Sequence, residues 1–369
     1  MTGAASRLLV ALDAQIASSR IPYEADGLRA ERACYRARQG RIDEAMQTAA
    51  TLRERYAARP NAVITAWVNL VEGLCCHFDD LGVGARDKLA RAHALSGWQP
   101  ASRLHLLCAA WLAHVDYTHH HTAAMSQHVR EALQFAAADD HTVRARACMV
   151  VAQALHLGSG LPLATPWYAA SHRHALAQGD DLTIAALIHN RGWLQLTRLG
   201  EAALTDDGSD AVRSAFEGIL SSQSYDRMIG AASIATITPL LQAQILCARG
   251  QAGEALLLFD SSTLATDDSR AKSRLASTML ADQAWCHVKL GHLEAARIDA
   301  LAAESSLVAA THVDDRAATH SRIAQVFRAL GDAAAADVHA SLASRHWQSF
   351  RQVQADMVTA LEGLDASSA

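Results

Sequence analysis

The stretch Leu290–Ala296, LGHLEAA, most constrains what this chain can fold into. A helix-like run ends before Gly291, and a second run begins at Glu294 with two alanines. Glycine takes the left-handed conformation that ends a helix without a steric penalty, and small residues beyond it let two helices close into a hairpin. The same pattern recurs at Arg38–Ala45, Arg249–Ala255 and Leu330–Ala336. The sequence therefore predicts a series of helical hairpins.

The hairpins repeat along the whole chain. Gly40, Gly250, Gly291 and Gly331 act as anchors, each with a small residue five positions after it and seven positions before it. The residues after the anchors are Ala45, Ala255, Ala296 and Ala336, and those before them are Ala33, Ala243, Ala284 and Ala324. Gly82, Gly158 and Gly200 fit less cleanly, and one missing anchor falls near His120. A period of about 40 residues predicts about eight helix pairs in a solenoid, because one hairpin cannot bury its apolar face alone.

This spacing of a small residue, a glycine and an alanine resembles the tetratricopeptide (TPR) repeat, and the resemblance covers nearly the whole chain. Phe259 lies nine residues after Gly250, where that family usually has an aromatic residue. The period is longer than the family's usual one of about 34 residues, and the helix-ending proline is mostly absent. Such longer units are similar to the sensory TPR regions of bacterial signalling proteins. The resemblance implies an all-α, right-handed α-solenoid, but a shared fold does not by itself imply a shared function.

We expect residues 1–364 to form a single TPR-like solenoid, followed by a disordered tail at 365–369. A leading helix at 5–19 precedes the first hairpin, and a long helix from about Asp332 to Leu364 caps the last one. Apolar residues recur on the far end of this helix at spacings of three and four, which is a heptad pattern. This end would either fold back onto the last hairpin, which we prefer, or form a homodimer. The stripe comprises Trp347, Phe350, Val353, Met357, Ala360 and Leu364.

Charge and hydropathy exclude several classes of protein. The formal net charge is −5, so the chain lacks the basic footprint of a nucleic-acid-binding protein. The most apolar stretch, 230–248, carries several serine, threonine and glutamine residues, which indicates a buried helix and not a membrane span. Near the N-terminus, Asp13 interrupts a short apolar run, so we expect no signal peptide.

The cysteines indicate a reducing compartment. Their number is odd, no two form a CxxC motif, and most lie among alanines and leucines, where cysteine behaves as a small hydrophobic residue. We therefore expect free thiols and a cytoplasmic location. The seven are Cys34, Cys75, Cys76, Cys108, Cys148, Cys247 and Cys286.

The residues that could bind a metal or act in catalysis are better explained by structural roles. His119, His120 and His121 are consecutive at a predicted turn, so they point in different directions and do not converge on a metal ion. Cys75-Cys76-His77 places neighbours along a helix, which do not face one another. Paired aspartates such as Asp139-Asp140 and Asp180-Asp181 lie beside helix starts, where carboxylates cap backbone N–H groups. No nucleotide, protease or hydrolase motif appears. We expect no enzyme activity, no cofactor and no metal.

The concave groove is the remaining candidate site. In the TPR family, residues thirteen, ten, six and three positions before the turn glycine face inward, and the resemblance transfers these positions to this chain. We expect them to bind a partner; alternatively, several are solvated or satisfied within their own repeat. They are Asn69, Glu72, His114, Tyr117, Asn190, Gln244, Trp285, Gln325 and Arg328.

The sequence thus favours a non-enzymatic interaction protein that binds a peptide or a partner protein in its groove. The alternative is a ligand-sensing regulatory TPR module that controls a separate effector protein. Either interpretation excludes nucleic acid and membrane as partners and allows a homodimer through the C-terminal helix. A sequence of this kind does not identify the ligand.

Overall fold

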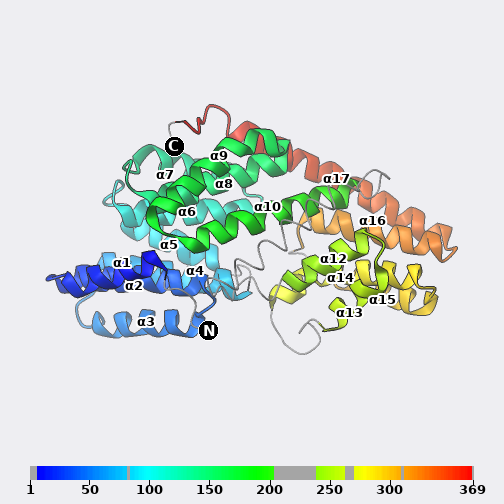
Figure 1. Cartoon of the computed structure of the whole chain (residues 1–369), viewed down its shortest axis with the longest axis horizontal. Helices are drawn as coiled ribbons and strands as arrows, with labels where there is room; N and C mark the ends of the chain where they lie inside the picture. The colour runs from blue at the N-terminus through cyan, green and yellow to red at the C-terminus, as the bar shows by residue number, and fades with distance from the viewer. Residues whose placement is uncertain (1–5, 81–83, 203–237, 262–269, 309–310, 368–369) are drawn as a thin grey trace. The chain divides into compact units, whose positions relative to one another are not determined.

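The computed structural model describes residues 6–80, 84–202, 238–261, 270–308 and 311–367, and throughout these ranges the regular elements are α-helices (Figure 1). The described part of the chain therefore contains no β-strand, and the predicted all-α class is confirmed. The helices are α1 (Arg7–Ser18), α2 (Pro22–Arg38), α3 (Ile42–Arg55), α4 (Ala62–Asp80), α5 (Ala85–Ser96), α6 (Arg103–Thr118), α7 (Thr122–Phe135), α8 (His141–Ser159), α9 (Leu161–Gln178), α10 (Asp181–Ala202), α12 (Thr238–Ala248), α13 (Ala252–Ser261), α14 (Arg270–Lys289), α15 (Leu293–Ser305), α16 (Val313–Ala329) and α17 (Ala333–Ala360).

The described residues fall into two compact units. Unit 1 contains 6–80, 84–187 and 356–367, and unit 2 contains 188–202, 238–261, 270–308 and 311–355. The assignment of 1–364 to a single domain stays a prediction, as does a disordered tail at 365–369, of which 368–369 lie outside the described residues.

Unit 1 contains the leading helix and four hairpins. The hairpins are α2–α3, α4–α5, α6–α7 and α8–α9, and α2 packs on α4 as α6 packs on α8. A continuous apolar core runs from α2 to α8, and Leu70, Leu89 and Leu106 in it are at most 1% exposed. The predicted leading helix is confirmed as α1, which packs through Leu8 and Leu12 against Tyr35 and Leu182.

Unit 2 contains three hairpins, α12–α13, α14–α15 and α16–α17. Phe259, at the position where the TPR family has an aromatic residue, is buried in the core between α12, α13 and α14. A second core joins α14, α15, α16 and α17 through small residues and Phe327. The part of the chain that the structure describes thus holds seven complete hairpins, and α10 precedes residues outside it. The predicted helical-repeat architecture is confirmed.

Five of the hairpin turns have the same geometry. In each, the first helix ends two residues before an anchor with positive φ, and the second begins two residues after it. The N–H beyond the anchor donates to the carbonyl five residues earlier, for example Gln251 to Leu246 at 2.9 Å, which closes a Schellman motif. The anchors are Gly40 (φ 79°), His120 (φ 58°), Gly250 (φ 76°), Gly291 (φ 78°) and Gly331 (φ 79°).

The less regular anchors behave differently. Gly158 lies inside α8, and the turn follows at Gly160 with φ 91°. Gly200 lies inside α10, and Gly82 lies outside the described residues. Both Gly158 and Gly200 are therefore wrong as turn anchors, because a helix of good helix-forming residues continues through one glycine at a modest cost of about 1 kcal/mol.

The spacing of small residues is confirmed in the core. Each alanine five positions after a turn glycine is at most 1% exposed, and each alanine seven positions before one is at most 3% exposed. His120 has Ala113 and Met125 at the same positions, and both are fully buried. These positions therefore lie in the buried interior of each hairpin.

The last helix folds back onto the chain. α17 is 28 residues long and ends at Ala360, four residues before the predicted end. Trp347, Phe350 and Met357 of the apolar stripe are buried, and Trp347 Nε1 donates to Ser321 Oγ of α16 at 3.0 Å. At its far end, within unit 1, Arg130 of α7 donates to the carbonyl oxygens of Ala360 and Glu362 at 2.9 and 2.7 Å. Trp347 thus contacts the first helix of the last hairpin, as expected, whereas the far end of α17 contacts α7 instead. A homodimer through this helix stays a prediction.

None of the seven cysteines, all of which lie among the described residues, forms a disulfide, and all except the half-buried Cys76 are buried. Among the described residues, no helix combines the length and the apolar character needed to cross a bilayer.

Candidate functional site

The first helices of unit 2 present one polar and aromatic face, which we name the inner face of unit 2. α12 packs on α14, and α14 packs on α16. The predicted residues Gln244, Trp285 and Gln325 lie six positions before the three turn glycines, one on each helix, and all three are half-buried. Asp282 and Arg322 lie nine positions before the anchors of α14 and α16. The repeat therefore places five side chains in register on the same face.

These five side chains contact one another. Gln244 Nε2 donates to Asp282 Oδ2 at 3.2 Å, and Arg322 Nε donates to Asp282 Oδ1 at 2.8 Å. Arg322 Nη1 also donates to Gln325 Oε1 at 2.7 Å, while its guanidinium lies 5.6 Å from the Trp285 ring. The structure thus brings together three of the predicted residues and adds Asp282 and Arg322.

This face combines an internally neutralised ion pair with two amides and an aromatic ring. Asp282 and Arg322 neutralise each other; burial alone would lower the pKa of Arg322, but the charge of Asp282 and its hydrogen bond raise it above the ordinary value. The amides of Gln244 and Gln325 can donate to and accept from a peptide backbone. The Trp285 ring supplies an apolar plane beside them.

The first helices of unit 1 form a second cluster, which we name the inner face of unit 1. Trp111, nine positions before His120, lies under the Arg146 guanidinium of α8 at 3.9 Å and 5.9 Å from that of Arg38. His114 lies edge-on to Trp111 at 5.6 Å and to His77 of α4 at 5.2 Å. All five side chains are buried. The inner face of unit 1 is therefore a packed interior.

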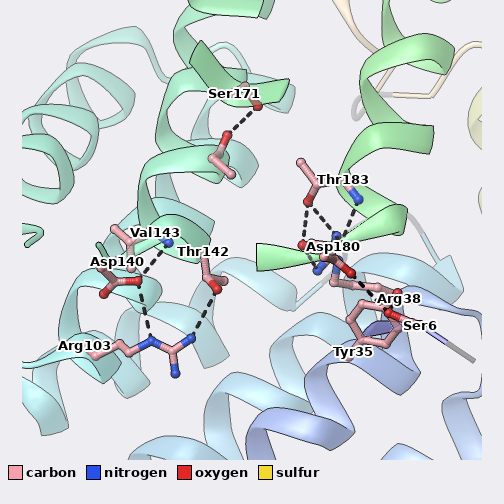
Figure 2. A network of polar contacts seen from close by, with 12 residues as sticks. Ser6, Tyr35, Arg38, Arg103, Asp140, Thr142, Val143, Ser171, Asp180 and Thr183 are labelled. Atoms are coloured by element: carbon pink, nitrogen blue, oxygen red, sulfur yellow. Dashed lines mark hydrogen bonds and ion pairs between the residues drawn. The ribbon is translucent and has the colours of Figure 1, made fainter. Parts of the chain in front are cut away.

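An ion pair joins this cluster to the start of α10 (Figure 2). Arg38 donates to both carboxylate oxygens of Asp180 at 2.8 and 3.0 Å and to Thr183 Oγ1 at 2.8 Å. Asp180 also accepts from the backbone N–H of Thr183, which caps α10 as the sequence predicts. Burial would raise the pKa of Asp180, but Arg38 holds it below the ordinary value. This bidentate pair fastens the end of α2 to the start of α10.

Arg146 has no such partner. Among the residues that the structure describes, no carboxylate forms an ion pair with it, and it is 5% exposed. Burial and the nearby charge of Arg38 lower its pKa well below the ordinary value. Burial, His77 and Arg146 likewise lower the pKa of His114 well below its usual range. On the inner face of unit 1, two buried guanidinium groups, those of Arg38 and Arg146, thus lie near one carboxylate, that of Asp180, which pairs with Arg38.

The remaining predicted residues lie elsewhere. Glu72 is buried and pairs with Arg53 of α3 and with Lys88 of α5, at 2.7 Å for Lys88, so it faces the second helices. Asn69 donates to the Thr65 carbonyl at 2.8 Å and lines a cleft beside the same helices. The other three are Tyr117, which is buried, Asn190, which is half-buried, and Arg328, which is exposed with its guanidinium 4.0 Å from Asp337.

Sequence reasoning missed Arg38, Trp111, Arg146, Asp282 and Arg322. Three of them share one signal, because Trp111, Asp282 and Arg322 each lie nine positions before an anchor. The spacing taken from the TPR family omits this position. For Arg38 and Arg146 the sequence offers no signal, since their position depends on contacts between distant hairpins.

Comparisons with known proteins support the fold. No family model matches the chain, and no curated protein matches it. Among solved structures, the chain is similar to a Rap protein complexed with competence and sporulation factor, with a TM-score of 0.55 and 14% identity. The match covers 94% of this chain and 98% of the other. At this identity the match shows a shared helical-repeat fold.

Proposed function

We propose that this chain is a non-enzymatic regulatory protein that binds a peptide or an extended segment of a partner protein on the inner face of unit 2. One observation carries the proposal: three successive first helices place Gln244, Asp282, Trp285, Arg322 and Gln325 in register and half-buried. An extended segment that crosses these three helices would meet all five side chains in turn. The similar Rap protein, complexed with competence and sporulation factor, supports a binding role. The free thiols support a cytoplasmic location.

A phage-displayed library of random linear peptides, selected on the full chain, tests this function. A selected peptide should bind the double variant Gln244→Ala, Gln325→Ala at least tenfold more weakly, while the melting temperature stays within a few degrees. Both amides lie at the face and contribute few core contacts, so their loss removes binding more than stability.

Leu257→Ala and Ile298→Ala provide matched controls. These side chains are 70% and 58% exposed on the second helices α13 and α15, and their loss should leave the affinity unchanged. A selected peptide that ignores the double variant but depends on either control would contradict the proposed function.

A second candidate is a sensor of a small anion, and Arg146 favours it. A buried guanidinium without a carboxylate costs several kcal/mol, and a bound anion would offset this cost. Arg146→Met should then raise the melting temperature without ligand and abolish any shift caused by added phosphate or citrate. A wild-type chain that responds to neither anion would argue against the sensor.

A further inference from the structure

Three helices of unit 1 bring together a cluster that neither inner face includes. His93 of α5, His105 of α6 and Glu131 of α7 place their ligand atoms within 4.8 Å of one another. His93 Nε2 lies 3.0 Å from Glu131 Oε2, and His105 Nε2 lies 2.8 Å from Glu131 Oε1. The two imidazole rings stack at 4.0 Å with 20° between their planes. Both rings therefore direct the same nitrogen at one carboxylate.

The contacts of His105 Nδ1 determine whether Nε2 of the same ring carries a proton. His105 Nδ1 lies 3.1 Å from the backbone carbonyl oxygen of His93, which can only accept, so Nδ1 donates. Ser96 Oγ, also 3.1 Å from Nδ1, uses its own proton on the Ala92 carbonyl at 2.9 Å and accepts here. In a neutral ring, Nε2 then carries a lone pair.

This lone pair faces another acceptor. An ionised Glu131 carboxylate has no proton to donate, so two acceptors would meet at 2.8 Å. The contact becomes favourable when the ring nitrogen carries a proton. It also becomes favourable when a metal ion binds both atoms, which then move to about 3.3 Å apart for tetrahedral zinc with bonds of about 2.0 Å. A carbonyl that fixes the tautomer of a ligating histidine is a common outer contact of metal sites.

We propose that His93, His105 and Glu131 bind one divalent transition-metal ion, for which zinc is the best match. Two imidazoles favour zinc over magnesium or calcium, which prefer oxygen ligands, and two histidines with one glutamate are a recognised zinc donor set. Three protein ligands leave a fourth position for water.

The surroundings give an ion access from solvent and keep one of its ligands in a fixed position. The His93 and Glu131 side chains are each 22% exposed, so solvent reaches the cluster, whereas His105 is 5% exposed and fixed from behind. Because the ligands come from three helices, a bound ion would link the α4–α5 hairpin to the α6–α7 hairpin. This site differs from the His119–His121 turn, whose consecutive residues cannot converge in this way.

Zinc titration of the chelator-treated full chain tests the proposal by calorimetry. We expect one zinc ion per wild-type chain and a higher melting temperature with zinc than without. Glu131→Gln keeps the shape and a hydrogen-bonding oxygen but removes the anionic ligand, and should weaken zinc affinity at least tenfold. His93→Asn and His105→Asn should do the same. Circular dichroism without zinc checks that each variant folds.

His287→Asn is the matched control, because His287, His292 and Asp299 form a looser cluster of similar composition. There His287 Nδ1 lies 3.4 Å from His292 Nδ1, and His287 Nε2 lies 3.5 Å from Asp299 Oδ2. This variant should bind zinc like the wild type. Lack of saturable zinc binding by the wild type, wild-type affinity in Glu131→Gln, or loss of binding in His287→Asn would each overturn the proposal.

Discussion

At the scale of single residues, one left-handed backbone position ends the first helix of five hairpins. Four of these positions hold glycine, and the fifth holds His120 with φ 58°. A non-glycine residue in this conformation costs about 1–2 kcal/mol. The turn is therefore kept by the packing of the helices on both sides, even where the residue itself disfavours it.

Gly291→Val should lower the free energy of unfolding by roughly 1–2 kcal/mol. A Cβ at Gly291 meets nothing within 4 Å, so the cost comes from the backbone conformation alone. Gly253→Ala is the control: its Cβ also meets nothing within 4 Å, but its φ is not positive and it lies within α13, so the variant should be neutral or slightly stabilised. Urea denaturation measures both, and equal effects would refute the turn assignment.

Single residues also show how far the sequence predicts the site. Gln244, Trp285 and Gln325 could be placed because each lies at a fixed distance from a regular turn. Glu72 could not be placed in this way. Four residues join α4 to α5, whereas three join the two helices of each regular hairpin. Its partners Arg53 and Lys88 also come from other helices. Spacing predicts a helix face, but it does not predict which charges pair across helices.

At the scale of elements, the buried Arg38–Asp180 pair links α2 to α10. Taking both charges out of water is costly, and removing one partner leaves the other buried without compensation. Secondary structure could be predicted from the glycine and alanine pattern, but this contact between residues 142 positions apart could not.

Asp180→Asn should therefore lower the free energy of unfolding by about 3–5 kcal/mol, since asparagine still caps α10 but leaves Arg38 unpaired. The double variant Arg38→Met, Asp180→Asn should lose less than the sum of the single losses. Asp140→Asn, at the equivalent cap of α8 beside the half-exposed Arg103, should cost no more than about 1 kcal/mol. Additive losses in the double variant would show that the two side chains do not depend on each other.

The buried end of α17 should also contribute to stability. Met357 is fully buried, so Met357→Ala should cost about 2–5 kcal/mol, whereas Val338→Ala, at a position 58% exposed on the same helix, should cost less than about 0.5 kcal/mol. Light scattering should give the same mass for both variants as for the wild type. A dimer in the wild type that Met357→Ala converts to a monomer would instead support the heptad seam.

At the scale of the whole molecule, buried histidines make stability depend on pH. Burial lowers the pKa of His189 to about 4, and burial with the charges of His339 and His346 lowers that of His320 to about 4. In the unfolded chain these groups titrate near 6.5. Between these values the unfolded state binds more protons, so the free energy of unfolding falls as the pH falls.

The melting temperature should therefore be highest above about pH 6.5 and should decline steadily toward about pH 4. His320→Gln should show a shallower decline, because it removes one of the groups that must stay neutral in the folded chain. Scanning calorimetry across this range makes the comparison. A melting temperature that does not change between about pH 7 and pH 5 would contradict the account.

The central claim is that the first helices of unit 2 bind an extended ligand, and photo-crosslinking tests it most directly. A peptide selected on the full chain, carrying a photoreactive residue, is irradiated in complex with the protein, and the crosslinked residues are identified by mass spectrometry. We predict crosslinks on α12, α14 and α16, near Gln244, Trp285 and Gln325. Crosslinks confined to the second helices α13 and α15 would contradict the claim.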